Sequence, residues 1–129
     1  MIPPANAKIY EGYLAAFWMD ETGILCANGK NVLRTLQNQK ENYELIKQIT
    51  GSKKVCLLSN TTNSSPPDKE TRDYIEKQLP AFFKAMAIIS QSAVGQIIPK
   101  IFTTVNINPI PIQYFTNEHE ARQWLQQHL

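Results

Sequence analysis

Short apolar runs alternate with polar turns along this chain, and their spacing predicts strands and helices in a regular order. The runs at residues 13–19 and 24–27 flank a polar turn that ends in Gly23, an arrangement typical of a β-hairpin. Three later apolar runs have the length and the polar flanks of strands buried inside a sheet. They are residues 54–59, 86–90 and 112–115.

Segments with helical spacing of apolar side chains fill the intervals around these later strands. In the first one, Asn38 is a candidate N-cap with Glu41 at the capping-box position. Gly51 then suits a left-handed cap at the helix C-terminus.

The second helix is predicted to open at Ser65, whose hydroxyl can cap it, and Pro66 suits its first position. Pro80 is expected to kink or restart the second helix, because proline lacks the amide hydrogen and clashes with the preceding turn.

Two further helices are predicted toward the end of the chain. A third helix covers residues 93–105 and is expected to bend at Pro99. The final helix should begin at Asn117, with Glu120 again at the capping-box position.

The predicted order is therefore β-β-α-β-α-β-α-β-α. The later strands each follow a helix, which implies parallel strands joined by right-handed crossovers. We expect an α/β fold with a mostly parallel mixed sheet, an N-terminal antiparallel hairpin and helices packed on the sheet. A chain of 129 residues with 43% apolar content suits a single domain over residues 1–129. Residues 1–8 precede the first element and are a candidate for disorder.

Charge and composition narrow the choice of partners and compartment. The 13 basic and 11 acidic residues are interleaved and leave a formal net charge of only +2, so we expect no nucleic-acid partner. The longest apolar run is too short to span a membrane, and the start of the chain lacks the apolar region of a secretory signal. Cys26 and Cys56 are expected to be buried, reduced thiols, with a disulfide as the alternative. These features predict a cytoplasmic protein without an integral membrane segment.

At this point the chain resembles a known group of small domains. The likeness is carried by residues 16–25, 54–58, 72–74, 84–90 and 115–125. In the last of these segments, Phe115, Ala121, Trp124 and Leu125 form a recurrent packing pattern. The element order and these segments are similar to the STAS domain, the anti-sigma-factor-antagonist fold, and most of all to its bacterial SpoIIAA-like branch, grouped with STAS/SEC14-type domains.

The resemblance implies a small switch module that binds a protein partner. In regulated members of that family, a Ser or Thr follows an Asp at the N-terminus of the helix after the third strand, and its phosphorylation alters partner binding. The matching loop here consists of Ser59, Asn60, Thr61, Thr62, Asn63, Ser64 and Ser65. Thr61, Thr62 and Ser64 are the candidate phosphorylation sites, and the chain departs from the pattern because Asn60 stands where the family has an acidic residue.

The same loop is of interest on physical grounds. It leads from the carboxyl end of a central strand into a helix, where ligands of open α/β sheets often bind and free backbone N–H groups favour an anion. It is therefore a candidate partner-binding or anion-binding loop. The alternative is that Ser, Thr, Asn and Pro stand here because turns and caps need them.

The predicted third helix is a second candidate site. Its apolar side chains recur at helical spacing, and Lys100 is its only charged residue. These apolar residues are Val94, Ile97, Ile98, Ile101, Phe102 and Val105. They suit core packing, a homodimer face, or a pocket for a small apolar ligand or lipid, as in SEC14-like carriers.

No motif of a known catalytic or cofactor site stands out. The chain has no Gly-rich phosphate loop, no G-x-S-x-G elbow and no HExxH, so we expect no enzymatic activity and no cofactor or metal. The leading hypothesis is a regulatory or adaptor module that binds an unknown protein through residues 59–67 and the helix that follows. The alternatives are a domain that binds a small molecule or lipid through residues 93–105, and a homodimeric structural protein.

Overall fold

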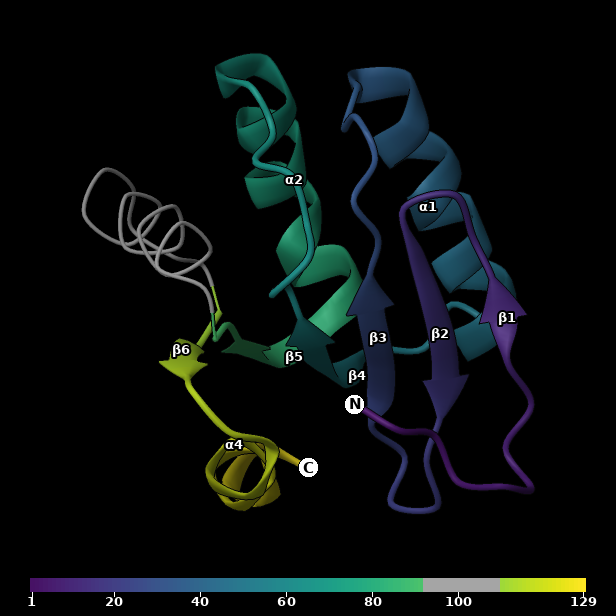
Figure 1. Cartoon of the computed structure of the whole chain (residues 1–129), viewed down its shortest axis with the longest axis vertical. Coiled ribbons are helices and arrows are strands. Elements are labelled where there is room, and N and C mark those ends of the chain that lie inside the picture. Colours follow the sequence, from purple (N-terminus) through teal and green to yellow (C-terminus); the bar gives the residue numbers. More distant parts are fainter. Residues whose placement is uncertain (92–109) are drawn as a thin grey trace.

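The computed structural model describes residues 1–91 and 110–129, and these residues form a six-stranded sheet flanked by helices. The strands stand side by side in chain order, and Figure 1 shows this arrangement. They are β1 (Tyr10–Glu11), β2 (Ala15–Met19), β3 (Leu25–Gly29), β4 (Val55–Asn60), β5 (Phe83–Ile89) and β6 (Ile112–Phe115). The pairs β1–β2 and β2–β3 are antiparallel, whereas β3, β4, β5 and β6 run parallel to one another.

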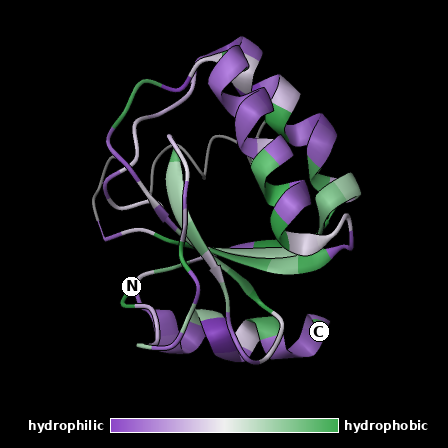
Figure 2. Ribbon diagram, turned by 90° about the vertical axis from the view of Figure 1, so that its right-hand side faces the viewer, coloured by the Kyte–Doolittle hydropathy of each residue, from purple (hydrophilic) through white to green (hydrophobic). Residues whose placement is uncertain are grey.

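The described helices lie on both faces of this sheet. They are α1 (Leu36–Thr50), α2 (Lys69–Phe82) and α4 (Glu118–Leu125), and a short 3-10 helix, η1 (Gln126–His128), follows α4. Helices α1 and α2 pack together on one face and α4 covers the other (Figure 2). The predicted α/β fold with an antiparallel opening hairpin and parallel later strands is therefore confirmed. None of the described helices is long and apolar enough to cross a membrane.

Two of the predicted helix starts are wrong. The first helix is capped by Thr35, whose Oγ1 accepts a hydrogen bond of 3.0 Å from the backbone N–H of Asn38. The second helix is capped by Asp68, whose carboxylate accepts a bond of 2.8 Å from the N–H of Thr71, and Ser65 lies before the helix. In both cases, another residue capable of capping stands three positions away. The cap is the one whose side-chain oxygen reaches the third helical N–H.

The remaining local predictions have mixed outcomes. Gly51 adopts the left-handed conformation, with φ of 64°, and Asn117 accepts a bond of 2.9 Å from the N–H of Glu120, so both predicted caps are confirmed. Helix α2 does not restart at Pro80 but continues to Phe82. Proline falls in the last turn of this helix, where a missing N–H breaks only the final part of the hydrogen-bond ladder. Strand β1 was not predicted, because two residues carry no periodic pattern.

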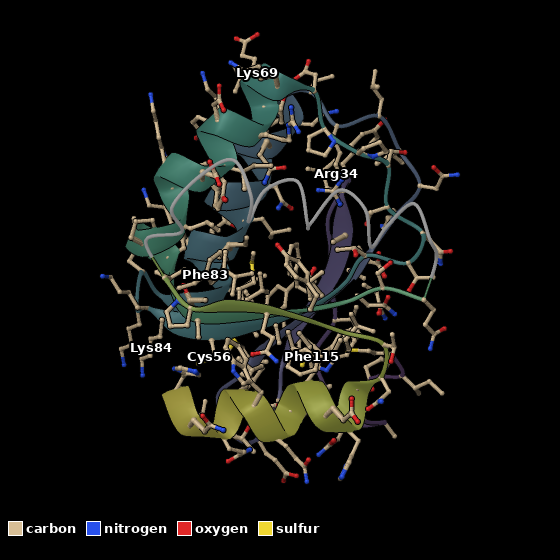
Figure 3. The ribbon with its side chains drawn as sticks, turned by 90° about the vertical axis from the view of Figure 1, so that its left-hand side faces the viewer. Arg34, Cys56, Lys69, Phe83, Lys84 and Phe115 are labelled. Atoms are coloured by element: carbon tan, nitrogen blue, oxygen red, sulfur yellow. The ribbon has the colours of Figure 1, made fainter. Side chains whose placement is uncertain are left out.

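Alternation along the strands divides the buried side chains into two layers. Phe17, Leu25 and Leu57 face α1 and α2, whereas Trp18 and Leu58 face α4. In Figure 3, Cys56 and Phe115 accordingly lie between the sheet and α4. The register between β4 and β5 shifts between Val55 and Cys56, so that Phe83 and Met86, three residues apart, both reach the layer under α1 and α2.

An ion-pair cluster attaches α4 to the opening hairpin. Arg122 of α4 donates to the carboxylate of Asp20 at 2.6 Å, to Glu118 at 2.8 Å and to the thiol of Cys26 at 3.5 Å. The two cysteines are both buried and free, as expected of buried thiols. Burial raises the pKa of the Cys26 thiol to about 11.

Two predicted segments remain, the N-terminal residues 1–8 and the third helix at 93–105. The N-terminal amino group donates to Asn28 at 3.1 Å, and the Asn28 amide donates to the carbonyl of Met1 at 2.7 Å, so residues 1–8 begin with a contact to β3. The predicted third helix at 93–105 lies outside the described residues. The same is therefore true of the candidate pocket or dimer face formed by Val94, Ile97, Ile98, Ile101, Phe102 and Val105.

Candidate functional site

The predicted 59–65 loop connects the carboxyl end of β4 to helix α2. Asn28 pairs with Asn60, and Asn60 with Ile89, at the ends of the parallel strands β3, β4 and β5. The loop therefore lies at the edge of the sheet where open α/β folds commonly place ligands. This position agrees with the one expected from the sequence.

Hydrogen bonds hold the first half of the loop against β5. The backbone N–H and the hydroxyl of Thr61 both donate to the carbonyl of Ile89, at 2.8 and 3.2 Å. The hydroxyl of Thr62 accepts from the N–H of Gln91 at 3.2 Å, and the N–H of Thr62 donates to the Asn60 side chain at 3.1 Å. These bonds use the loop hydroxyls for structure, which is the turn chemistry considered as the alternative above.

The second half of the loop packs against the segment that follows β3. The Ser65 hydroxyl donates to Asn31 at 3.0 Å, and the Ser64 hydroxyl accepts from the guanidinium of Arg34 at 3.2 Å. Ser64 also lies so close to Gly29 that a Cβ atom at position 29 would collide with its hydroxyl. The candidate phosphorylation sites Thr61, Thr62 and Ser64 are thus all half-buried and hydrogen-bonded, and their modification stays a prediction.

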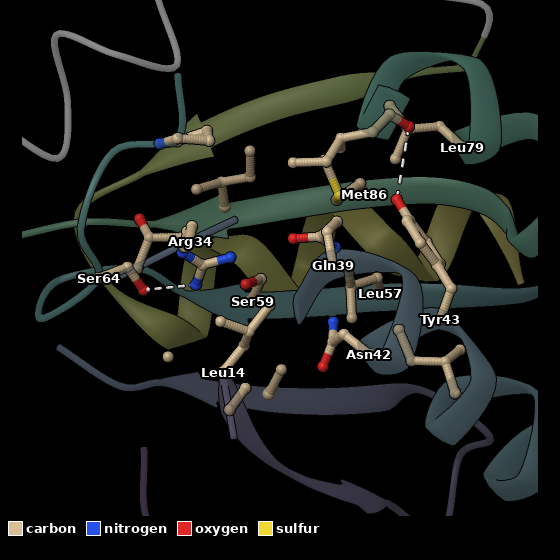
Figure 4. Close-up of a pocket in the computed structure, with 18 of the residues that line it drawn as sticks. Leu14, Arg34, Gln39, Asn42, Tyr43, Leu57, Ser59, Ser64, Leu79 and Met86 are labelled. Atoms are coloured by element: carbon tan, nitrogen blue, oxygen red, sulfur yellow. Dashed lines mark hydrogen bonds between the residues drawn. The ribbon is translucent and has the colours of Figure 1, made fainter. Parts of the chain in front are cut away.

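Beneath this loop, a cavity opens between the sheet and helices α1 and α2. Its volume is about 190 Å³. Leu57 and Met86 line it from the sheet, Tyr43 and Leu79 line it from the helices, and Ser64 lines its end at the loop (Figure 4). The Tyr43 hydroxyl donates to the carbonyl of Ile75 at 3.4 Å and so joins α1 to α2 beside the cavity. Burial raises the pKa of Tyr43 well above its usual range, so that this group stays protonated.

Three polar side chains from one stretch of the chain reach this largely apolar cavity. Arg34 precedes α1, and Gln39 and Asn42 follow it one turn apart on the inward face of that helix (Figure 4). Gln39 is only 5% exposed, and among the described residues its Oε1 has no hydrogen-bond partner; the same holds for Oδ1 of Asn42. Burial lowers the pKa of Arg34, although its guanidinium remains a cation at neutral pH.

Sequence reasoning did not identify these polar residues as a site. The available signal was the position of Gln39, which shares the inward helical face with Tyr43 and Ile46 at i+4 and i+7. A polar residue on such an apolar stripe suggests a buried polar contact. The proximity of Arg34 to Ser64, 30 residues later, depends on the tertiary structure alone.

No three His, Cys, Asp or Glu side chains in the part of the chain that the structure describes are placed to hold a metal ion. His119 is exposed on the first turn of α4, and the His128 ring packs 4.6 Å from the ring of Trp124, as centroids.

Comparison with known proteins supports the fold and the family. A solved structure of an uncharacterized protein of the DUF3478 family, with a SpoIIAA-like fold, from Shewanella loihica PV-4, superimposes with a TM-score of 0.57. The two chains share 18% sequence identity over 92% of this chain and 91% of the other. At this identity the likeness shows the fold, and the SpoIIAA-like fold expected from the sequence is confirmed. Among curated proteins, none matches this chain. The model of a family described as a domain of unknown function, DUF7793, matches residues 17–129, and this chain therefore belongs to the DUF7793 family.

Proposed function

We propose that this chain is a cytoplasmic, non-enzymatic regulatory module that binds a partner protein through residues 59–67 and the start of α2. The SpoIIAA-like fold supports this role, because the family that the sequence resembles uses this fold for small switch modules that bind a protein partner. The observation that carries the proposal is the network of hydrogen bonds that holds the 59–65 loop at the carboxyl edge of the parallel strands.

The loop is preorganised by contacts to three separate parts of the chain. Thr61 bonds to the end of β5, Ser65 to Asn31 after β3, and Ser64 to Arg34 before α1. A loop that internal hydrogen bonds already hold in place loses less conformational entropy when a partner docks than an unconstrained loop does. The bonds therefore support a recognition surface more than a flexible connection.

The surface that this loop presents carries polar groups from its tip and from the next helix. Asn63 supplies a polar side chain at the tip, where Pro66 is also exposed, and Asp68, Lys69 and Glu70 are exposed at the start of α2. Asp68 and Glu70 place negative charge at the helix N-terminus, where the helix dipole favours it. The partner surface expected here is polar and carries basic groups opposite these carboxylates.

Phosphorylation belongs to the proposal as a means of regulation. A phosphate on Thr61 would remove the hydroxyl that donates to Ile89, whereas a phosphate on Ser64 would form charge-assisted bonds with the neighbouring Arg34 guanidinium. A phosphate on Thr62 would place negative charge at the oxygen that accepts from the N–H of Gln91, and each modification would add negative charge to the loop. Intact-mass measurement of protein isolated from its own cells tests for this modification, and digestion locates it.

Site-directed photo-crosslinking in cells tests the partner surface. A benzophenone amino acid replaces Asn63 at the loop tip, and the matched control carries it at Gln123, which is exposed on α4 on the opposite face of the sheet. A discrete crosslinked species is expected at position 63 and not at position 123. The same species at both positions, or at position 123 alone, would exclude the loop as the binding surface.

A further inference from the structure

The cavity beneath the 59–65 loop is large enough to hold a small molecule. Its volume of about 190 Å³ exceeds the roughly 150 Å³ of an engineered apolar protein cavity that admits benzene. Apolar side chains from the sheet and from the helices that cover it form most of its wall, among them Phe17, Leu57, Leu79 and Met86. A compact apolar or aromatic body therefore fits this space.

Positive charge lies at the end of the cavity nearest to the loop. The Arg34 guanidinium lines the cavity and bonds to the Ser64 hydroxyl, and no carboxylate among the described residues forms an ion pair with it. A largely buried guanidinium without a counterion loses hydration and gains no compensating charge. A ligand carboxylate would supply that charge through a bidentate pair with the planar guanidinium.

Two side-chain amides line the cavity wall between Arg34 and Tyr43 (Figure 4). Oε1 of Gln39 and Oδ1 of Asn42 are buried without a partner among the described residues, and both side chains line the cavity. A buried polar atom without a partner is unfavourable, so a hydroxyl or amine on the ligand would satisfy it. Glu76 also lines the cavity, and its charge adds to burial in raising the pKa of Tyr114. The carboxylate of a ligand should therefore lie toward Arg34 and away from Glu76.

We propose that the cavity between the sheet and helices α1 and α2 binds a small organic monocarboxylate with an apolar or aromatic body and a hydrogen-bond donor, its carboxylate paired with Arg34. The ligand body contacts Leu57 and Met86, and its donor faces Gln39 and Asn42. This site goes beyond the partner-binding role and does not depend on it, because it lies inside the domain and needs no second protein.

Titration with 4-hydroxybenzoate, followed by NMR of the ¹⁵N-labelled protein, tests the site directly. Phenylacetate is a second carboxylate probe. The control is 4-hydroxybenzyl alcohol, in which a neutral group replaces the carboxylate, so that the role of the charge is tested on the wild-type protein. Saturable shifts are expected at the Gln39 and Asn42 side-chain amides and at cavity-lining backbone amides. The alcohol should bind at least about tenfold more weakly, because it lacks the charge that pairs with Arg34.

Substitutions at Arg34 then test whether its guanidinium supplies the positive charge that binds the carboxylate. Arg34→Gln should weaken carboxylate binding by at least about tenfold, and Arg34→Lys should restore part of it. Lys53→Gln removes the same charge from an exposed turn outside the cavity and should bind like wild type. Each variant is first shown to be folded by thermal unfolding.

Three outcomes would overturn the site. The first is the absence of saturable shifts with both carboxylates on the folded wild-type protein. The second is equal affinity for the acid and the alcohol. The third is a set of shifts confined to residues outside the cavity. None of these outcomes bears on crosslinking at position 63, so failure of the ligand site and failure of the partner surface are separately visible.

Discussion

Asp20 and Arg122, 102 residues apart, form an ion pair of 2.6 Å that joins the β2–β3 turn to helix α4. The Asp20 side chain is only 7% exposed, and its Oδ1 also accepts bonds from the backbone N–H groups of Thr22 and Ile24, at 2.9 and 3.0 Å. One carboxylate thus both shapes the turn and attaches the helix that covers one face of the sheet.

Two substitutions at Asp20 should separate these roles. Asp20→Ala removes the turn acceptor and the ion pair and should lower the free energy of unfolding by about 2–3 kcal/mol. Asp20→Asn keeps an oxygen for the turn and loses only the charge, so a smaller loss of about 1–2 kcal/mol is expected. Urea unfolding of the three proteins provides the comparison. Equal losses in both variants would mean that the turn bonds contribute nothing.

The same carboxylate predicts an acid dependence of stability. Burial raises the pKa of Asp20, but hydrogen bonds from Thr22, Arg122 and Ile24 outweigh burial and hold it below its usual value. A lowered folded-state pKa means that this contribution is complete above the unfolded-state pKa of about 3.9 and is lost as the pH falls through the folded-state value. The stability difference between wild type and Asp20→Asn should therefore be constant near neutral pH and shrink below about pH 4. A difference that persists unchanged in acid would contradict this.

The position of the first helix cap can be tested by a matched pair. Thr35→Ala removes the hydroxyl that accepts from the N–H of Asn38 and should destabilise the protein by about 1 kcal/mol. Asn38→Ala, at the residue that the sequence favoured, lies inside α1 and should have a smaller effect, because alanine is the better helix former. Chemical denaturation gives the free energy of unfolding of both variants, and a larger loss for Asn38→Ala than for Thr35→Ala would indicate that Asn38 is the cap.

Close packing of Gly29 against Ser64 predicts a compensating pair of substitutions. Gly29→Ala places a methyl group where the Ser64 hydroxyl lies and should lower stability by about 1–3 kcal/mol. Hydrogen-exchange protection of the Ser64 amide, which donates to Thr61, should fall as well. Adding Ser64→Gly removes the obstructing side chain and should recover part of the loss. Additive losses in the double variant would show that the two positions do not interact.

The two thiols should be inert in the folded protein. Cys26 is fully buried with a pKa of about 11, and Cys56 is 1% exposed with its pKa raised by burial. Since the thiolate is the reactive form, neither should react with a disulfide reagent at neutral pH until the protein unfolds. Two thiols should then react in urea. Rapid labelling of Cys26 in the native state would contradict the packing of α4 over this strand.

Local signals in the sequence were enough to place most of the elements. Gly23 and Gly51 both have positive φ, at 87° and 64°. Gly23 lies in the turn between β2 and β3 and Gly51 caps the end of α1, where the sequence indicated a turn and a cap. Asn117 caps its helix, with Glu120 three positions later as the capping-box pattern requires, and this prediction was correct. Where two capping residues stand three apart, as at Thr35 and Asn38, local chemistry cannot choose between them. The packing of the helix decides.

The sequence predicts the loop of the candidate site but not the cavity beneath it. The loop at 59–65 follows from the general rule about the carboxyl ends of parallel strands. The polar wall of the cavity does not, because the meeting of Arg34 with Ser64 requires β3, β4 and α1 to be in place. Strand β1 depends in the same way on its pairing with β2, since Tyr10 and Glu11 have no strand pattern of their own.

The chain-order arrangement of the strands has a consequence for how the protein is made. As the ribosome releases the chain, each of β2, β3, β4 and β5 can pair at once with the strand before it, and no strand waits for a distant partner. The layer that contains Trp18, Cys26 and Leu58 is different, because it is covered by α4, which begins more than 90 residues after Cys26. In a nascent chain this apolar face therefore stays uncovered until α4 has been synthesised. This face is where chaperones would engage and where aggregation of a truncated chain would begin.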